Sequence, residues 1–333
     1  MGTGSVRVGV IGMRFGAQVH IPAFRSDARC VVAAVASRDA ARAETAAAQL
    51  KVPVFHADWR ALVADPSIDA VSLAVPPADQ PGIIIEAARA GKHVFCEKPL
   101  AASLDDAERA LEAARRAGIV HAIDFIFPEI PAWQRARDLL RSGAIGAPRR
   151  FSYAWRVQTF AARTRADSWK NRPAEGGGAC GNFMPHVIFN LEWLLGPFVR
   201  LDGAPRHGDS PSCCDCVAHI AGGIEGSIAI ETDAPVPAGH QLQIVGETGT
   251  LTLSNTTSDY AQGFELHVSA GGREELPSRD VCAADGDGRI GPVARVVQRF
   301  VDGILEGRAA DPNLEDGVRV QRWLERITHA VPQ

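Results

Sequence analysis

The first 124 residues alternate between short apolar runs and longer segments in which apolar residues recur at helical spacing. Strands separated by helices of this length predict right-handed crossovers and a doubly wound parallel sheet. We therefore predict one α/β domain over residues 1–124. The predicted strands are 6–11, 31–36, 70–75, 94–95 and 120–123. The first predicted helix ends near residue 24, and three more span residues 40–50, 81–90 and 104–117.

After residue 124 the pattern changes to strands with alternating polarity and a few longer helices. Short polar or glycine-bearing turns between these strands predict antiparallel hairpins. Residues 125–333 are therefore predicted to form an α+β domain. Its predicted strands are 149–157, 216–220, 225–231, 241–245, 250–253 and 264–268, and its predicted helices are 128–142, one ending near 195, 293–306 and 315–328.

The composition favours a small molecule as the partner. A net charge of -4 and a pI near 6.2 give no broad attraction to nucleic acid or to an anionic membrane. No apolar run approaches transmembrane length, and the N-terminus lacks the apolar core of a signal peptide. We expect a cytoplasmic protein.

Seven cysteines, an odd number spread mostly singly, fit a reducing compartment better than a disulfide scaffold. One cluster, Cys213, Cys214 and Cys216 with His219 nearby, looks like half of a zinc site. It lacks a second ligand pair, and adjacent side chains of a strand point to opposite faces. We predict no metal site.

A turn with small residues follows the first predicted strand, where Gly12, Met13, Arg14 and Phe15 lead into a helix. In a strand–turn–helix unit, backbone N–H groups and the positive helix end bind the pyrophosphate of a dinucleotide. Gly12 fits the first position of the glycine pattern and Ala17 the third. Arg14 stands where a second glycine normally lets the backbone approach the pyrophosphate.

The residues after the second and third strands refine the cofactor prediction. Ser37 and Arg38 stand where a site for NAD would hold an acid, and they are able to bind a 2′-phosphate. We therefore prefer NADP(H), with NAD possible. The alternative is that Ser37 or Asp39 caps the next helix and Arg38 is solvated. Pro76 ends the third strand at the same sheet edge as Gly12 and joins the predicted cofactor site.

Glu97, Lys98 and Pro99 follow the fourth strand. Pro99 keeps Lys98 out of the helical conformation, so the strand ends here, at the edge where open α/β sheets bind their ligands. Glu97 and Lys98 are therefore predicted to lie in the cofactor site, and Lys98 is the candidate catalytic lysine. The alternative is a solvated lysine paired with Glu97.

Asn182 and His186 are four residues apart and share one helix face. Because proline is tolerated only in a first helical turn, Pro185 predicts that this helix begins near 181 or 182. His186 would then lie near the positive helix end, which lowers its pKa and suits it to proton transfer near neutral pH. The alternative is a structural histidine in an apolar helix.

Taken together, these motifs resemble the Gfo/Idh/MocA family of NAD(P)-dependent oxidoreductases, over nearly the whole chain. The residues that carry the resemblance are His20 and Pro22, 91–100, Ser142, Gly143, Ile145 and Gly146, Trp169 with 176–178, and Glu315, Asp316, Gly317 and Gln321.

The resemblance implies a Rossmann domain and an α+β domain with an open, mainly antiparallel sheet, through which the chain forms a homo-oligomer, a dimer or a tetramer. It implies hydride transfer at a carbinol carbon of a sugar, cyclitol or nucleotide sugar. Lys98 would orient the reacting oxygen and His186 would be the general acid or base. Trp169 and Asn182 would join them in binding the substrate.

The chain departs from the family's pattern at Arg14, Asn182, Met184 and Ile126. The family commonly has aspartate and glycine at the positions of Asn182 and Met184, and many members carry an arginine near Ile126. These departures leave two alternatives open: a reductase of imines or other small carbonyls, and a catalytically silent dinucleotide-binding protein.

Overall fold

The computed structural model describes residues 5–164, 167–205, 212–270, 273–279 and 287–328. The chain forms two compact units, Met1–Ile126 with Arg289–Gln321 and Phe127–Gly288 with Arg322–Gln333. The predicted division at residue 124 placed the C-terminal helices entirely in the second domain. Residues 289–321 instead belong to the first unit, because the helix at 290–306 packs against its sheet and first helix.

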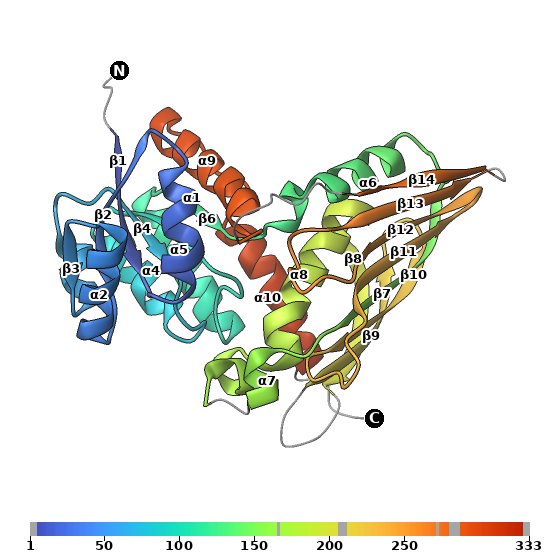
Figure 1. Ribbon diagram of the computed structural model, residues 1–333, viewed down its shortest axis with the longest axis horizontal. Helices are drawn as coiled ribbons and strands as arrows, with labels where there is room; N and C mark the ends of the chain where they lie inside the picture. Colours follow the sequence, from blue (N-terminus) through green and yellow to red (C-terminus); the bar gives the residue numbers. More distant parts are fainter. Residues whose placement is uncertain (1–4, 165–166, 206–211, 271–272, 280–286, 329–333) are drawn as a thin grey trace. The chain divides into compact units, whose positions relative to one another are not determined.

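A six-stranded parallel sheet forms the centre of the first unit, in the order β3-β2-β1-β4-β5-β6 (Figure 1). The strand order reverses between β1 and β4, so the crevice at their carboxyl ends is the switch point where such sheets bind ligands. The predicted parallel sheet is confirmed. The strands are β1 Val6–Ile11, β2 Cys30–Ala36, β3 Val54–His56, β4 Ala70–Leu73, β5 His93–Cys96 and β6 His121–Ile123.

The helices of this unit form two layers: α3, α4 and α5 contact one another in sequence, and α1 contacts α9. Local signals set their ends. Asp39 caps α2 and Ser103 caps α5 by accepting backbone N–H groups, and Gly118 ends α5 with a positive φ. The helical elements are η1 Gly16–His20, α1 Ile21–Arg25, α2 Ala40–Leu50, α3 Trp59–Ala64, α4 Gln80–Arg89, α5 Leu104–Ala117, α9 Ile290–Glu306 and α10 Leu314–Thr328, which continues into the second unit.

An eight-stranded sheet forms the second unit, in the order β14-β13-β12-β11-β7-β10-β9-β8. The predicted hairpins β9–β10, β11–β12 and β12–β13 are confirmed, whereas β7 and β10 pair in parallel. The edge strands β8 and β14 were not predicted. The strands are β7 Pro148–Arg156, β8 Phe198–Pro205, β9 Cys213–Ile220, β10 Ile224–Glu231, β11 Gly239–Gly246, β12 Gly249–Asn255, β13 Glu265–Ala270 and β14 Arg273–Arg279.

Helices α6 and α8 pack on this sheet, and burial alternates along its strands. On β11, Leu242 and Ile244 are fully buried, while Gln241 and Gln243 are exposed. One face is therefore the core of the unit and the other is polar and open. The helical elements are η2 Phe127–Glu129, α6 Pro131–Arg141, α7 Phe160–Thr164, η3 Trp169–Asn171, η4 Pro173–Glu175 and α8 Gly178–Leu195.

A disulfide joins Cys180 of α8 to Cys214 of β9. The sequence favoured a reducing compartment over a disulfide scaffold and did not predict this single bond. Because of it, Cys214 is not available to the zinc cluster considered above. Cys213 and Cys216 are free. Over the residues described, none of the helices combines the length and the apolar character that a membrane span requires.

Candidate functional site

The carboxyl ends of the parallel strands bring the predicted cofactor residues to one edge of the first unit's sheet. Gly12 follows β1, Ser37 follows β2, Pro76 lies three residues after β4, and Glu97 follows β5. Gly12 has φ +103°, and a Cβ on it would lie 2.2 Å from the carbonyl oxygen of Ala74. Only glycine fits this turn, because any side chain would overlap the backbone that follows β4.

The rest of the turn differs in exposure from residue to residue. Met13 is buried, Arg14 is exposed, and Phe15 is half-buried with its ring edge-on to His20, 5.2 Å between centroids. The guanidinium of Arg289, at the start of α9, lies 4.9 Å from the centre of the Phe15 ring. Arg14 therefore stands at the surface of the turn.

Ser37 and Arg38 lie at the end of β2, next to β1 in the sheet. The Ser37 hydroxyl accepts the backbone N–H of Asp39, and Asp39 caps α2, as the alternative reading of this segment predicted. Arg38 is 79% exposed and pairs with Asp79 at 3.5 Å. A guanidinium so exposed is able to exchange this partner for a phosphate, because surface ion pairs contribute little free energy.

The segment carrying Lys98 is fixed by the fully buried side chain of Gln80 in α4. Its Nε2 donates to the carbonyl oxygens of Glu97 and Pro99, at 2.9 and 2.8 Å, and its Oε1 accepts the N–H of Glu97 at 3.0 Å. The Lys98–Pro99 peptide bond is cis. The backbone on both sides of Lys98 is therefore held by one amide.

A polar cluster lies beneath this segment. His20 is fully buried; its Nδ1 lies 2.8 Å from Ser72 Oγ, and its Nε2 lies 3.1 Å from Glu97 Oε1 and 3.9 Å from Asp124 Oδ2. Burial and the neighbouring charge of Glu97 raise the pKa of Asp124 well above its usual range. Burial also acts to raise the pKa of Glu97, but the hydrogen bond and charge of His20 outweigh it, so that pKa is lowered.

Sequence reasoning missed three members of this arrangement, Ser72, Gln80 and Asp124. Asp124 had a signal, since an acid directly after a parallel strand lies at the same sheet edge as Glu97. Ser72 lies in a short apolar strand and Gln80 starts a helix, and neither position differs in the sequence from an ordinary polar residue. Glu97, predicted for the cofactor, points its carboxylate to His20.

In the second unit, glycines shape the approach to α8. A Cβ on Gly177 would lie 2.0 Å from the carbonyl oxygen of Trp169, and a Cβ on Gly181 would lie 2.0 Å from that of Gly176. This close packing lets α8 begin at Gly178. The predicted start near 181 or 182 is therefore wrong, and Pro185 lies inside the helix.

His186 is consequently in the third turn of α8 rather than the first, which weakens the influence of the helix end on its charge. The imidazole is 4% exposed, 5.0 Å from the ring of Phe127 and 6.1 Å from that of Trp155, measured between centroids. Asn182 is half-buried and donates from Nδ2 to the carbonyl oxygen of Lys170 at 3.0 Å. It thereby ties α8 to the half-buried Trp169 segment.

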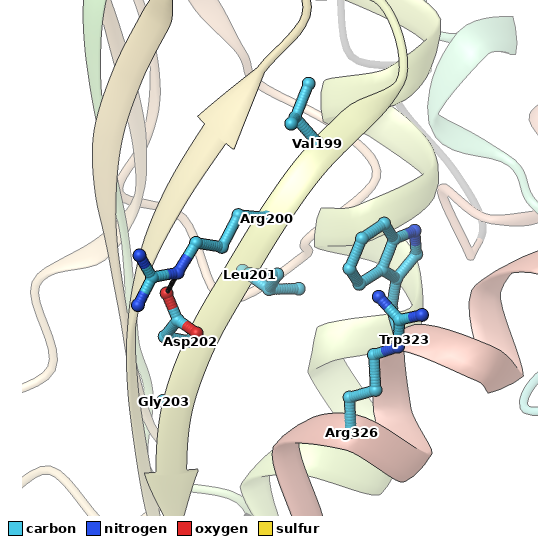
Figure 2. A pocket seen from close by; sticks show the side chains of 7 residues that line it. All are labelled: Val199, Arg200, Leu201, Asp202, Gly203, Trp323 and Arg326. Carbon is cyan, nitrogen blue, oxygen red and sulfur yellow. Dashed lines mark ion pairs between the residues drawn. The ribbon is translucent and has the colours of Figure 1, made fainter.

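A surface hollow of about 200 Å³ lies between β8 and the end of α10, lined by Arg200, Asp202, Trp323 and Arg326 among others (Figure 2). Arg200 pairs with Asp202 within it, and the Arg326 guanidinium lies 4.8 Å from the Trp323 ring. None of the predicted site residues lines this hollow, so we assign it no part in the candidate site.

Two family models match the chain. The oxidoreductase family with an NAD-binding Rossmann fold, Gfo/Idh/MocA, matches residues 6–125, and the Gfo/Idh/MocA C-terminal domain matches residues 133–252. An uncharacterised oxidoreductase of Synechocystis sp. is 32% identical over 98% of this chain and 94% of its own length.

Two further relatives have named substrates. The dTDP-3,4-didehydro-2,6-dideoxy-α-D-glucose 3-reductase of Streptomyces violaceoruber is 30% identical over 76% of this chain and 74% of its own. The structure of levoglucosan dehydrogenase in complex with NADH and levoglucosan superposes with a TM-score of 0.86 at 24% identity, covering 97% of this chain and 96% of the other. With both domain models matched in order, the chain belongs to the Gfo/Idh/MocA family of NAD(P)-binding oxidoreductases.

Proposed function

We propose that this protein transfers a hydride between NADP(H) and a carbinol or ketone carbon of a sugar, cyclitol or nucleotide sugar. The observation that carries the proposal is Lys98, which the Gln80 amide fixes at the carboxyl edge of the sheet that also carries Gly12. Relatives that act on a sugar and on a nucleotide sugar support the substrate class. The exposed Arg38 and the absence of an acid at residue 37 support NADP(H) over NAD(H).

The roles of the residues follow from the chemistry of the reaction. The nicotinamide, when bound, supplies or accepts the hydride. A carbinol that loses a hydride must also lose its hydroxyl proton, and we assign acceptance of that proton to His186. The Lys98 ammonium stabilises the negative charge that develops on the oxygen. Trp169 and Asn182 belong to the proposed substrate site through the loop that they join to α8.

Replacement of Lys98 by methionine tests the proposal, because the side chain keeps its length and loses its charge. Removing one donor to a developing oxyanion typically costs about 100-fold to 1,000-fold in rate, so kcat should fall by at least that factor. Lys51→Met, at an exposed position after α2, is the matched control and should retain parental turnover. Full turnover of Lys98→Met on a sugar or nucleotide-sugar substrate would refute the proposal.

Cofactor choice is tested separately by fluorescence titration with NADPH and NADH. The parent should bind NADPH more tightly than NADH. Arg38→Ala should weaken NADPH binding and leave NADH binding unchanged, since only the 2′-phosphate contacts the guanidinium. Arg60→Ala, which removes another exposed arginine from the same unit, is the control. Tighter NADH binding by the parent would overturn the NADP(H) assignment.

We also propose that the chain forms a homo-oligomer through the open face of the eight-stranded sheet. That face carries small and polar side chains around Ala154, Ala229, Gln243 and Thr252, and the partly exposed Val245. Light scattering should give a dimer or a tetramer, and Gln243→Arg at the centre of the face should reduce the mass. A parent of monomer mass at micromolar concentration would contradict this proposal.

A further inference from the structure

The buried cluster beneath Lys98 has no role in the hydride transfer proposed above. We propose that Glu97 and Asp124 share a single proton, carried by Asp124, and that the remaining negative charge on Glu97 keeps Lys98 charged and positioned for the reaction. Glu97, Asp124 and His20 are then positioning residues that act through Lys98. The inference rests on the proposed function for the use made of Lys98, but the arrangement of charge is a property of the protein alone.

The geometry requires the two carboxyl groups to share a proton. One atom each of His20, Glu97 and Asp124 lie within 4.8 Å of one another, and the Glu97 and Asp124 side chains are 16% and 3% exposed. Two carboxylates this close in a buried site do not both ionise, because their repulsion is not screened by water. One group therefore stays neutral at pH 7, and the pair carries one charge instead of two.

The partners decide which group is ionised. Glu97 lies at hydrogen-bond distance from His20, whose other ring nitrogen contacts Ser72, and it feels the charge of the adjacent Lys98. Asp124 is more deeply buried, and its distance to His20 is longer, at 3.9 Å. The pKa of Asp124 is accordingly raised and that of Glu97 lowered, in the directions expected for a proton that Asp124 donates toward Glu97.

Charged and titratable groups reach this pair from each element packed around it. His20 comes from η1 and Ser72 from β4. Cys96 is the last residue of β5, and Lys98 follows Glu97 just after that strand. Arg289, at the start of α9, lowers the pKa of Asp124 together with Lys98, while the buried Cys96 thiol has its own pKa raised by burial and by the two acids. The charge of Lys98 lowers the pKa of both acids, so the charge that remains on Glu97 acts in turn on the ammonium.

The experiment compares two substitutions that mimic the two assignments. Asp124→Asn resembles a neutral carboxyl group at that position, whereas Glu97→Gln removes the proposed charge. The readout is the Nζ resonance of Lys98 in ¹⁵N-lysine-labelled protein without substrate; the chain has few lysines, and Lys98→Met identifies the signal. A carboxylate within about 4–6 Å typically shifts a neighbouring pKa by about 1–3 units.

We therefore expect the Lys98 titration midpoint to fall by about 1 unit or more in Glu97→Gln, and to stay within about 0.5 unit of the parent in Asp124→Asn. Glu97→Asp keeps the charge and should restore most of the shift, which separates loss of charge from loss of structure. Glu86→Gln, on the exposed surface of α4, is the matched carboxyl-to-amide control. Infrared spectra in heavy water should show a protonated carboxyl band at neutral pH that Asp124→Asn abolishes.

Equal midpoint shifts in the two variants, or a protonated carboxyl band that survives in Asp124→Asn, would overturn the inference. Neither measurement uses turnover, so a protein that proves inactive on sugars would refute the proposed function and leave this result standing. If both proposals hold, the basic limb of the pH profile of kcat should move to lower pH in Glu97→Gln, in parallel with the Lys98 resonance.

Discussion

His240 provides a test of how burial controls the stability of the second unit. Its ring is 2% exposed, stacks on Trp155 with 4.3 Å between centroids and 6° between planes, and places Nε2 2.6 Å from the Tyr153 hydroxyl. Burial lowers the pKa of His240 to about 3, because the imidazolium would lose its hydration among aromatic rings. The folded unit therefore holds this histidine neutral.

The shift has a definite sign and size. An unfolded histidine titrates near pH 6.5, so below that pH the unfolded chain binds a proton at His240 that the folded unit does not bind. The stability contribution is complete above about pH 6.5, declines as the pH falls, and is fully lost near pH 3. At about 1.4 kcal/mol per pH unit, the loss between pH 7 and pH 4 is about 3 kcal/mol.

Urea unfolding followed by tryptophan fluorescence measures this loss, because every tryptophan except Trp59 lies in the second unit. The double variant His240→Phe with Tyr153→Phe removes both partners of this contact. It also takes the Tyr153 hydroxyl from the buried Asn190, a loss that does not depend on pH and so cancels when pH slopes are compared. Its free energy of unfolding should fall about 3 kcal/mol less than that of the parent between pH 7 and pH 4. His219→Phe, at a partly exposed position on β9, reports the effect of removing a histidine that is not in the core. Identical pH slopes for the parent and the double variant would refute the assignment of this loss to His240.

Two further predictions concern the glycine turn and the disulfide. Gly12→Ala should abolish NADPH binding and lower the free energy of unfolding by several kcal/mol, since its Cβ would overlap the Ala74 carbonyl. The control is Gly82→Ala, where a Cβ meets nothing within 4 Å; it should leave NADPH binding unchanged and leave the free energy of unfolding unchanged or slightly higher. The Cys180–Cys214 bond closes a loop with a sequence separation of 34, so its reduction should lower the free energy of unfolding by about 4 kcal/mol through chain entropy. Thiol titration of the unfolded chain should give seven thiols after reduction and five before it. Equal thiol counts would show that the bond is absent.

The sequence was most informative where local chemistry and global fold agree. The strands that precede Gly12 and Lys98 are buried except for Arg7 and the half-buried His93, and Ser103 caps the helix that follows β5, so apolar runs and a cap residue predict these elements closely. Strand β3 and helix α3 were missed because they are short, and β3 also lies at the edge of the sheet, where it is mostly exposed. Pattern alone does not distinguish such elements from a loop, since only tertiary packing defines them.

The predicted start of the helix that carries His186 was wrong for a different reason. Proline usually marks a first turn, but the glycines at 177 and 181 let the backbone approach the neighbouring loop, and that packing extends the helix before Pro185. The disulfide of Cys180 was equally hidden, because its partner lies 34 residues away and the pairing depends on how α8 lies on β9. The disulfide thus depends on a contact between segments that are distant in sequence, whereas the start of α8 depends on close backbone packing within the loop just before it.

Two of the four departures from the family's pattern, Arg14 and Asn182, differ in what they affect. Arg14 is exposed on the turn that begins at Gly12, so its side chain is free of the packed backbone, and we expect it to place a positive charge near the proposed cofactor site. Asn182 uses its amide to hold the Lys170 carbonyl, a contact that an aspartate is unable to make because it has no N–H to donate. The substitution therefore changes how the Trp169 loop is fixed to α8 and removes a negative charge from the helix that carries His186. We therefore expect differences in substrate between this chain and aspartate-bearing members of the family to originate in that loop.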